Sequence, residues 1–230
     1  MTKKLTVSLT KYETILGWIY LPLQLLVIPA ILIFLNTLAG APFDETQINF
    51  IFFCVNFLLL TLIFHRFLVQ SANVSLAAPW KTISSALLGY AIYMAGSYFL
   101  NILIYTLEPE FFNVNDSNIA QLAEGNFPLT LFGTVILVPV AEELLFRGLL
   151  FAGFYNRSRI LAYAVTIVLF SLLHVLGYIG LYEPKMLILS LLQYIPASIA
   201  LAWAYARADS IWAPILLHMT VNAVGMTAMR

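Results

Sequence analysis

Seven runs of about twenty apolar residues dominate this 230-residue chain and restrict it to very few folds. Lipid offers no hydrogen-bond partner to backbone N–H and C=O groups, so a chain crosses a bilayer as helices or as a closed barrel. Runs of this length cross about 30 Å of hydrocarbon as α-helices. We therefore predict an all-α, polytopic membrane helix bundle with about seven transmembrane helices, at residues 15–38, 47–69, 83–107, 128–152, 160–180, 186–206 and 211–229.

The composition also indicates a membrane protein. Hydrophobic residues make up 62% of the chain and charged residues 10%, whereas soluble domains carry about 25% charged residues. Basic and acidic residues balance at 11 each, so the sequence predicts no nucleic-acid partner. The single cysteine, Cys54, lies in an apolar run and is expected to be a small buried hydrophobe. The sequence carries no signal of oligomeric state.

The segments between the apolar runs alternate in charge. The N-terminus and the second and fourth connections are basic, while the first and third connections are acidic. The positive-inside rule then predicts a multi-pass protein of the cell membrane with a cytoplasmic N-terminus and an external C-terminus. We expect one membrane domain over 1–230, with N-terminal helices at 15–127 and core helices at 128–229. The acidic stretch 108–127 is expected to be a solvated connector or a weakly amphipathic segment on the outer surface. The short chain and brief loops indicate a bacterial protein.

Three ionisable residues lie inside the fourth apolar run, where a charge costs roughly 2.5–3.5 kcal/mol or more. Glu143 and Arg147 are four residues apart, so they lie on one helix face and are expected to form a buried ion pair. Glu142 lies about 100° from Glu143 around the helix and points elsewhere. A carboxylate held away from water at this depth is suited to act as a general base. Pro139 precedes it, and a proline there kinks the helix and admits water at that level.

Two later apolar runs carry further polar residues at similar depth. His174 lies in the fifth run, four residues after Phe170, and His218 and Asn222 share one face of the last run. Each of them alone is commonly a buried structural residue or a hydrogen bond between helices. Together with Glu142 they offer a carboxylate, two imidazoles and a carboxamide, which are the groups needed to activate water and to stabilise an oxyanion. We therefore predict that the three helices converge on one pocket.

These residues resemble three motifs of the CAAX prenyl protease type 2 family, also called CPBP or Abi intramembrane proteases, which includes bacteriocin-immunity members. The motifs are Glu142-Glu143-x-x-Phe146-Arg147-Gly148, Phe170-x-x-x-His174 and His218-x-x-x-Asn222, and the resemblance covers about residues 128–226. It implies an all-α bundle of eight helices or fewer that acts as an endopeptidase in the membrane. Glu142 and His174 would then activate the attacking water, and His218 and Asn222 would form the oxyanion hole. Glu143, Arg147 and Phe170 would support the site.

Several alternatives stay open at this stage. The family has been described both as metal-independent glutamic proteases and as metalloproteases, and Glu143, His174 and His218 could supply three zinc ligands. We favour metal-free hydrolysis, because Arg147 already accounts for Glu143 and no His-Glu-x-x-His pattern is present. A non-catalytic immunity or scaffold protein and a proton-coupled transporter are further possibilities. The expected partners are the lipid bilayer and a peptide or membrane-protein substrate, because nothing in the chain indicates recognition of a prenyl group.

Overall fold

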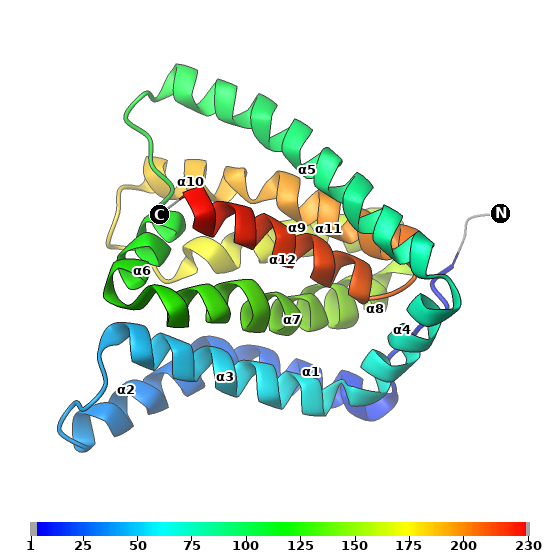
Figure 1. Ribbon diagram of the computed structural model, residues 1–230, viewed down its shortest axis with the longest axis horizontal. Coiled ribbons are helices and arrows are strands. Elements are labelled where there is room, and N and C mark those ends of the chain that lie inside the picture. The colour runs from blue at the N-terminus through cyan, green and yellow to red at the C-terminus, as the bar shows by residue number, and fades with distance from the viewer. Residues whose placement is uncertain (1–3, 229–230) are drawn as a thin grey trace.

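The computed structural model describes residues 4–228, and nearly all of that range is helical (Figure 1). Three segments, η1, η2 and η3, are π-helical stretches inside longer helices. The elements are α1 (Lys11–Pro22), η1 (Leu23–Val27), α2 (Ile28–Leu38), α3 (Glu45–Ile63), α4 (His65–Ala77), α5 (Pro79–Leu107), α6 (Val114–Phe132), η2 (Gly133–Leu137), α7 (Val138–Glu143), η3 (Leu144–Phe151), α8 (Ala152–Tyr155), α9 (Arg159–Leu176), α10 (Pro184–Gln193), α11 (Ile195–Ala208) and α12 (Trp212–Ala228).

The predicted all-α, multi-pass bundle is confirmed, although the number of spans differs. Within residues 4–228, six helical stretches are long and apolar enough to cross a membrane. The predicted seventh span corresponds to α12, which has 17 described residues. At 1.5 Å per residue it is about 26 Å long, somewhat less than the hydrocarbon thickness. The six stretches are Lys11–Leu38, Glu45–Ile63, Pro79–Leu107, Val114–Tyr155, Arg159–Leu176 and Pro184–Ala208.

Two predicted span boundaries differ from the helix boundaries in the structure, the end of the second span and the start of the fourth. The second span was predicted to continue to residue 69, but α3 ends at Ile63 and a separate helix, α4, follows the non-helical residue Phe64. The fourth predicted span, 128–152, lies within the helical stretch Val114–Tyr155, which is kinked at Asn126 just before the predicted start. The side-chain oxygen of Asn126 accepts the backbone N–H of Leu129, which is how an N-cap starts a helix. Pro128 follows in the first turn, where its missing N–H has no cost.

The stretch 108–127 is not a solvated connector, so that prediction is wrong. Helix α6 begins inside it at Val114, which is fully buried, and Leu122 is buried as well. The hydroxyl of Thr46 in α3 donates to the backbone carbonyl of Leu122. Apolar residues of this stretch therefore pack inside the protein, while polar residues such as Glu124 stay exposed.

The continuous helix η2–α7–η3 lies at the centre of the molecule. All eight residues of η3 are buried, and its six leucine and phenylalanine residues form much of the apolar core. Helices α1 and α3 contact this helix from one side, and α9, α11 and α12 contact η2, α7 or η3 from the other (Figure 1). Helix α5 crosses the bundle against α11 and α12. Gly89 allows that crossing, because a Cβ there would lie 2.7 Å from the Leu217 side chain.

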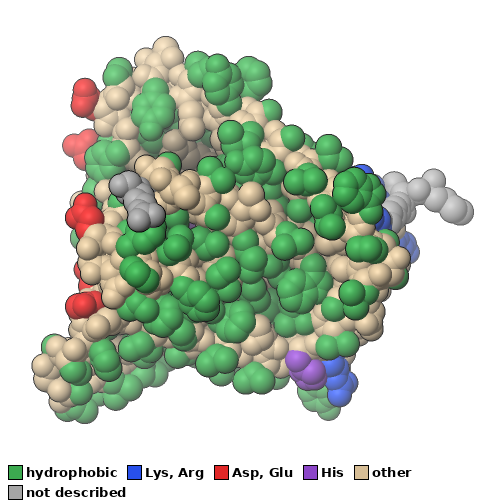
Figure 2. All heavy atoms as spheres, in the orientation of Figure 1, with side chains coloured by type: hydrophobic (Ala, Val, Ile, Leu, Met, Phe, Trp, Pro, Cys, Tyr) green, Lys and Arg blue, Asp and Glu red, His purple; other side chains and the backbone are tan. Residues whose placement is uncertain are grey.

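Most exposed charged side chains lie at the two ends of the bundle. Figure 2 shows acidic side chains at the left end and basic side chains at the right end, where the described chain begins. The surface between the two ends is largely hydrophobic, as a lipid-facing surface must be. Single exposed residues such as Leu62 and Phe99 belong to this surface. The charge separation has the pattern that the positive-inside rule describes.

Candidate active site

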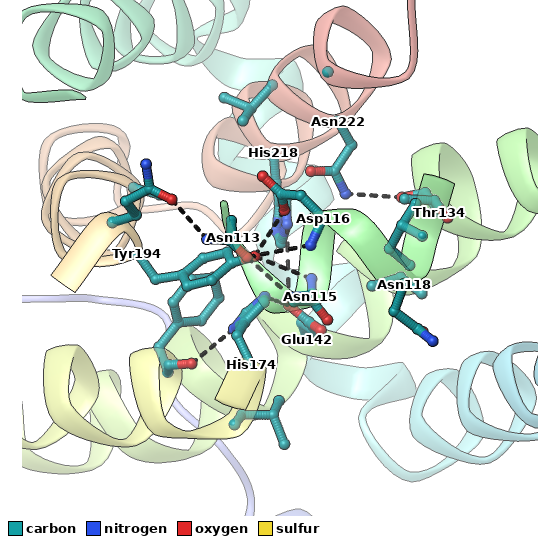
Figure 3. Close-up of a pocket in the computed structure, with 18 of the residues that line it drawn as sticks. Asn113, Asn115, Asp116, Asn118, Thr134, Glu142, His174, Tyr194, His218 and Asn222 are labelled. Carbon is teal, nitrogen blue, oxygen red and sulfur yellow. Dashed lines mark hydrogen bonds and ion pairs between the residues drawn. The ribbon is translucent and has the colours of Figure 1, made fainter. Parts of the chain in front are cut away.

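A cavity of about 430 Å³ lies among helices from both halves of the chain. Its lining includes Glu142, His174, His218 and Asn222, so the structure brings together the four residues that the sequence singled out (Figure 3). Phe170 also lines the cavity. The supporting residues Glu143 and Arg147 are fully buried and lie outside the cavity lining.

Glu142 faces both imidazoles. Its Oε2 atom lies 3.9 Å from Nε2 of His174 and 4.0 Å from Nε2 of His218. The same oxygen is buried and makes no hydrogen bond within the described residues. An unpaired buried carboxylate oxygen is costly, so such an atom commonly marks a functional site. Both ring nitrogens are too far away for a direct hydrogen bond, and the spacing suits a small molecule held between the three groups.

A backbone contact fixes the tautomer of His174. Its Nδ1 atom lies 2.8 Å from the carbonyl oxygen of Phe170, one helical turn earlier. A carbonyl only accepts, so Nδ1 must carry the proton. In the neutral ring Nε2 is then a free acceptor, and this is the nitrogen that faces Glu142.

His218 is held from its other side by Glu143. Nδ1 of His218 lies 2.8 Å from Oε1 of Glu143, and Nε2 points toward Glu142. The two adjacent glutamates therefore approach opposite nitrogens of one imidazole. The sequence predicted the pairing of Glu143 with Arg147 but gave no sign of this second partner, because it lies 75 residues away on α12.

The predicted ion pair between Glu143 and Arg147 is present and entirely buried. The Arg147 guanidinium lies 3.1 Å from Glu143 Oε1 and donates to the backbone carbonyl of Ser198 at 3.2 Å. It also lies 4.5 Å from the centre of the Phe170 ring, within the range of a cation–π contact. Arg147 thus joins α7 and η3 to α9 and α11 and fixes the carboxylate that orients His218.

Asn222 supplies a hydrogen bond that Pro139 cannot make. In the π-helical register of η2 the Val138 N–H bonds to the carbonyl of Gly133, five residues earlier. The next carbonyl, that of Thr134, would face the nitrogen of Pro139, which has no hydrogen. The side-chain amide of Asn222 donates to this carbonyl at 2.8 Å. Proline, π-helix and asparagine therefore form one unit at the edge of the cavity.

Sequence reasoning missed most of the polar lining of the cavity. Nine of the sixteen Asn and Gln residues in the chain line it, and the only signal was their density around residues 113–118. Tyr178 also lines the cavity, and its hydroxyl donates to Asn115. Burial raises the pKa of Tyr178 to about 12, so the hydroxyl keeps its proton at neutral pH. The nine carboxamides are Gln24, Asn49, Asn56, Asn101, Asn113, Asn115, Asn118, Gln193 and Asn222.

The residues proposed as zinc ligands do not fit that role as a set. Oε1 of Glu143 already accepts from Arg147 and from His218, and its side chain is fully buried away from the cavity. Within residues 4–228, no group of three or more His, Cys, Asp or Glu side chains has an arrangement that could hold a metal ion.

Comparison with known proteins finds a family model that matches the second half of the chain. Residues 124–224 match the family model described as "Type II CAAX prenyl endopeptidase Rce1-like". Through this segment the chain is similar to the Rce1-like family. The matched segment contains all four residues that converge on the cavity, and the resemblance found in the sequence motifs is confirmed.

Two curated bacterial proteins are similar to the chain. UPF0177 protein YxdF of Lactococcus lactis subsp. lactis (strain IL1403) is 26% identical over 139 residues, which cover 60% of this chain and 71% of the relative. "Putative membrane peptidase YdiL" of Bacillus subtilis (strain 168) is 29% identical over 96 residues. That alignment covers 41% of this chain and 35% of the longer relative. No solved structure gives a significant match.

Proposed function

We propose that this Rce1-like protein is an intramembrane endopeptidase that hydrolyses a peptide bond with a water molecule activated by Glu142 and His174. One observation carries the proposal: the buried, unpaired Oε2 of Glu142 lies about 4 Å from both imidazole Nε2 atoms. The family match and the name of the Bacillus relative support peptidase activity independently of that geometry.

The proposed reaction begins with a water molecule hydrogen-bonded to Glu142 and to Nε2 of His174. Glu142 removes a proton as the water oxygen attacks the peptide carbonyl, which becomes a tetrahedral oxyanion. The proton then passes from Glu142 to the amide nitrogen, the C–N bond breaks, and an acid and an amine are released. His174 keeps the water aligned, because its Nδ1–H is committed to the Phe170 carbonyl and its Nε2 is left to accept.

His218 and Asn222 are proposed to stabilise the oxyanion. The Glu143 carboxylate accepts the Nδ1–H of His218 and orients the ring so that Nε2 faces the cavity. A ring that carries a hydrogen on Nε2 in this orientation donates it to the oxyanion. The amide of Asn222 has two hydrogens, and the bond to Thr134 uses one of them. The second donor is available to the oxyanion. Removal of one donor of this kind typically lowers turnover by about 10²–10³-fold.

We propose that the hydrolysis needs no metal ion. The position of Glu143 supports this, because its carboxylate is fully buried outside the cavity lining and its Oε1 accepts from Arg147 and His218. The test is cleavage by protein purified in a chelator and analysed for bound zinc. Full activity without zinc supports the proposal, and activity lost in the chelator and restored by zinc contradicts it.

The proposed substrate is a peptide or a membrane-protein precursor that reaches the cavity from the membrane. We also propose that the basic end of the bundle is cytoplasmic and the acidic end external, with the C-terminus outside, in a bacterial cell membrane. Single cysteines at Glu110 and Arg157, each in a Cys54→Ser background, test this orientation. An impermeant maleimide applied to intact cells should label the cysteine at Glu110 and leave that at Arg157 unlabelled.

Activity and substrate are tested together by quantitative mass spectrometry of membrane peptides. Cells that produce the wild-type protein are compared with cells that produce Glu142→Ala. Glu124→Ala, which removes a carboxylate from the exposed side of α6, is the matched control. Cleavage products present with wild type and Glu124→Ala but absent with Glu142→Ala support the proposal. Identical peptides in all three strains contradict it and favour the non-catalytic membrane partner.

A further inference from the structure

Tyr194 lies directly on the imidazole that the proposed reaction uses. Its ring is stacked on His174, with 4.0 Å between ring centres and 23° between ring planes. The Phe170 ring is a second aromatic neighbour, with its centre 4.7 Å from that of the imidazole. Figure 3 shows Tyr194 and His174 side by side at the cavity. Tyr194 lies at the junction of α10 and α11, outside the three motifs that identified the site.

The hydroxyl of Tyr194 is tied to the first turn of α6. It donates to Oδ1 of Asp116 at 2.8 Å, with Oδ1 of Asn113 as a second acceptor at 3.2 Å. It accepts from the side-chain amide of Asn115 at 3.0 Å. Three polar side chains of the segment 113–116 therefore fix the far end of the tyrosine.

His174 needs such support because its own hydrogen bond leaves freedom. The single bond from Nδ1 to the Phe170 carbonyl fixes one atom of the ring, and the plane can still rotate about that contact. A rotation of this kind moves Nε2, which must point at the water next to Glu142. A flat aromatic surface against the imidazole restricts the rotation. A misplacement of about 1 Å at such a position lowers turnover by about 100-fold.

We infer that Tyr194 is a positioning residue, which holds the imidazole plane of His174 so that Nε2 faces Glu142 and is itself anchored by the first turn of α6. The expected effect of Tyr194 on turnover rests on the proposed function, whereas its effect on the orientation of the His174 ring does not. The geometry of the imidazole is a separate claim and is measured separately.

Three variants distinguish the effect of the stacked ring on turnover from the effect of the hydrogen bonds that anchor its hydroxyl. Tyr194→Leu removes the aromatic surface and should lower kcat by about 100-fold, with KM changed less than about twofold. Tyr194→Phe keeps the ring and loses the hydroxyl, so kcat should fall only about fivefold, as expected for one hydrogen bond. Asp116→Ala removes the acceptor at 2.8 Å and should lower kcat by about as much as Tyr194→Phe. Tyr182→Leu removes a tyrosine from the same end of the molecule that does not line the cavity, and it serves as the control.

The second measurement does not depend on cleavage. NMR spectra of protein labelled at histidine, with His174 assigned through His174→Gln, report the ring current of Tyr194 on the imidazole. The carbon-bound protons of His174 should move downfield in Tyr194→Leu and stay near their wild-type positions in Tyr194→Phe and Tyr182→Leu. Circular dichroism confirms that each variant is folded. Tyr194→Met, which also removes the aromatic ring, serves if Tyr194→Leu does not fold.

The outcomes distinguish this inference from the proposed function. If Tyr194→Leu keeps wild-type kcat while Glu142→Gln loses it, the positioning role is wrong and the peptidase proposal stands. If the wild-type protein cleaves nothing, the NMR comparison still decides the placement of His174. Unchanged His174 signals in Tyr194→Leu, or equal losses of kcat in Tyr194→Leu and Tyr182→Leu, overturn the inference.

Discussion

The apolar helices of the two halves of the molecule differ in how much of them is buried within the protein. In the first half, only 11%, 17% and 11% of the most apolar stretches of Lys11–Leu38, Glu45–Ile63 and Pro79–Leu107 are buried within the protein. In the second half, Val114–Tyr155 is 56% buried. Side chains of the first half mostly face lipid, while the second half surrounds one central helix. The difference explains why ionisable residues are tolerated at Glu142, Glu143 and Arg147, where protein replaces lipid as the surroundings.

The first half nevertheless forms part of the cavity wall. Asn56 on α3 and Asn101 on α5 line the cavity, and each accepts a hydrogen bond, from Tyr20 and from Gln193 respectively. A helix that is hydrophobic on most of its surface therefore still presents single polar residues inward. The first half contributes the wall, and the second half contributes the residues proposed to react.

The largest difference in stability between the halves is expected when an arginine is replaced by alanine. Arg147→Ala leaves Glu143 buried without its cation and should destabilise the protein by about 3–5 kcal/mol. Arg66→Ala, at an exposed position near the start of α4, should change stability by less than about 0.5 kcal/mol. Thermal unfolding in a mild detergent measures both. Similar melting temperatures for the two variants would contradict the assignment of Arg147 as a buried structural cation.

The next contrast in stability is between a buried leucine of the second half and an exposed leucine of the first half. Leu149 is 2% exposed and contacts the position of Gly17 on α1, so Leu149→Ala should cost about 2–5 kcal/mol. Leu62 is 69% exposed on the surface assigned to lipid, and Leu62→Ala should leave stability nearly unchanged. The measurement is the unfolding free energy of both variants in lipid nanodiscs. A large loss for Leu62→Ala would show that this surface packs against protein rather than lipid.

The smallest effects on stability are expected for two glycine-to-alanine substitutions, one where the halves meet and one within the second half. Gly89→Ala introduces a Cβ 2.7 Å from Leu217 between α5 and α12 and should cost about 1–3 kcal/mol. Gly153→Ala meets no atom within 4 Å and should stabilise its helix by up to about 1 kcal/mol. Melting temperatures of the two variants should therefore move in opposite directions. A rise for Gly89→Ala would mean that α5 packs less closely than described.

The sequence predicted those features that depend on local pattern. Hydropathy located the spans, because run length alone decides whether a helix can cross a membrane. Spacing by four residues predicted that Glu143 meets Arg147 and that His218 and Asn222 share a face. The contacts of Glu143 with His218 and of Tyr194 with His174 could not be predicted, because they depend on how separate helices are oriented. The packing of α6 against other helices could not be predicted, because several of its polar residues line the cavity, where polarity does not indicate exposure to solvent.

The turnover of Glu142→Gln tests the central claim most directly. Glutamine keeps the size of the side chain and its hydrogen bonding but cannot take a proton from water. With a substrate identified by mass spectrometry, the account predicts a loss of kcat of about 10²–10⁴-fold and an unchanged melting temperature. Wild-type turnover by Glu142→Gln would contradict the assignment of Glu142 as the base that activates water.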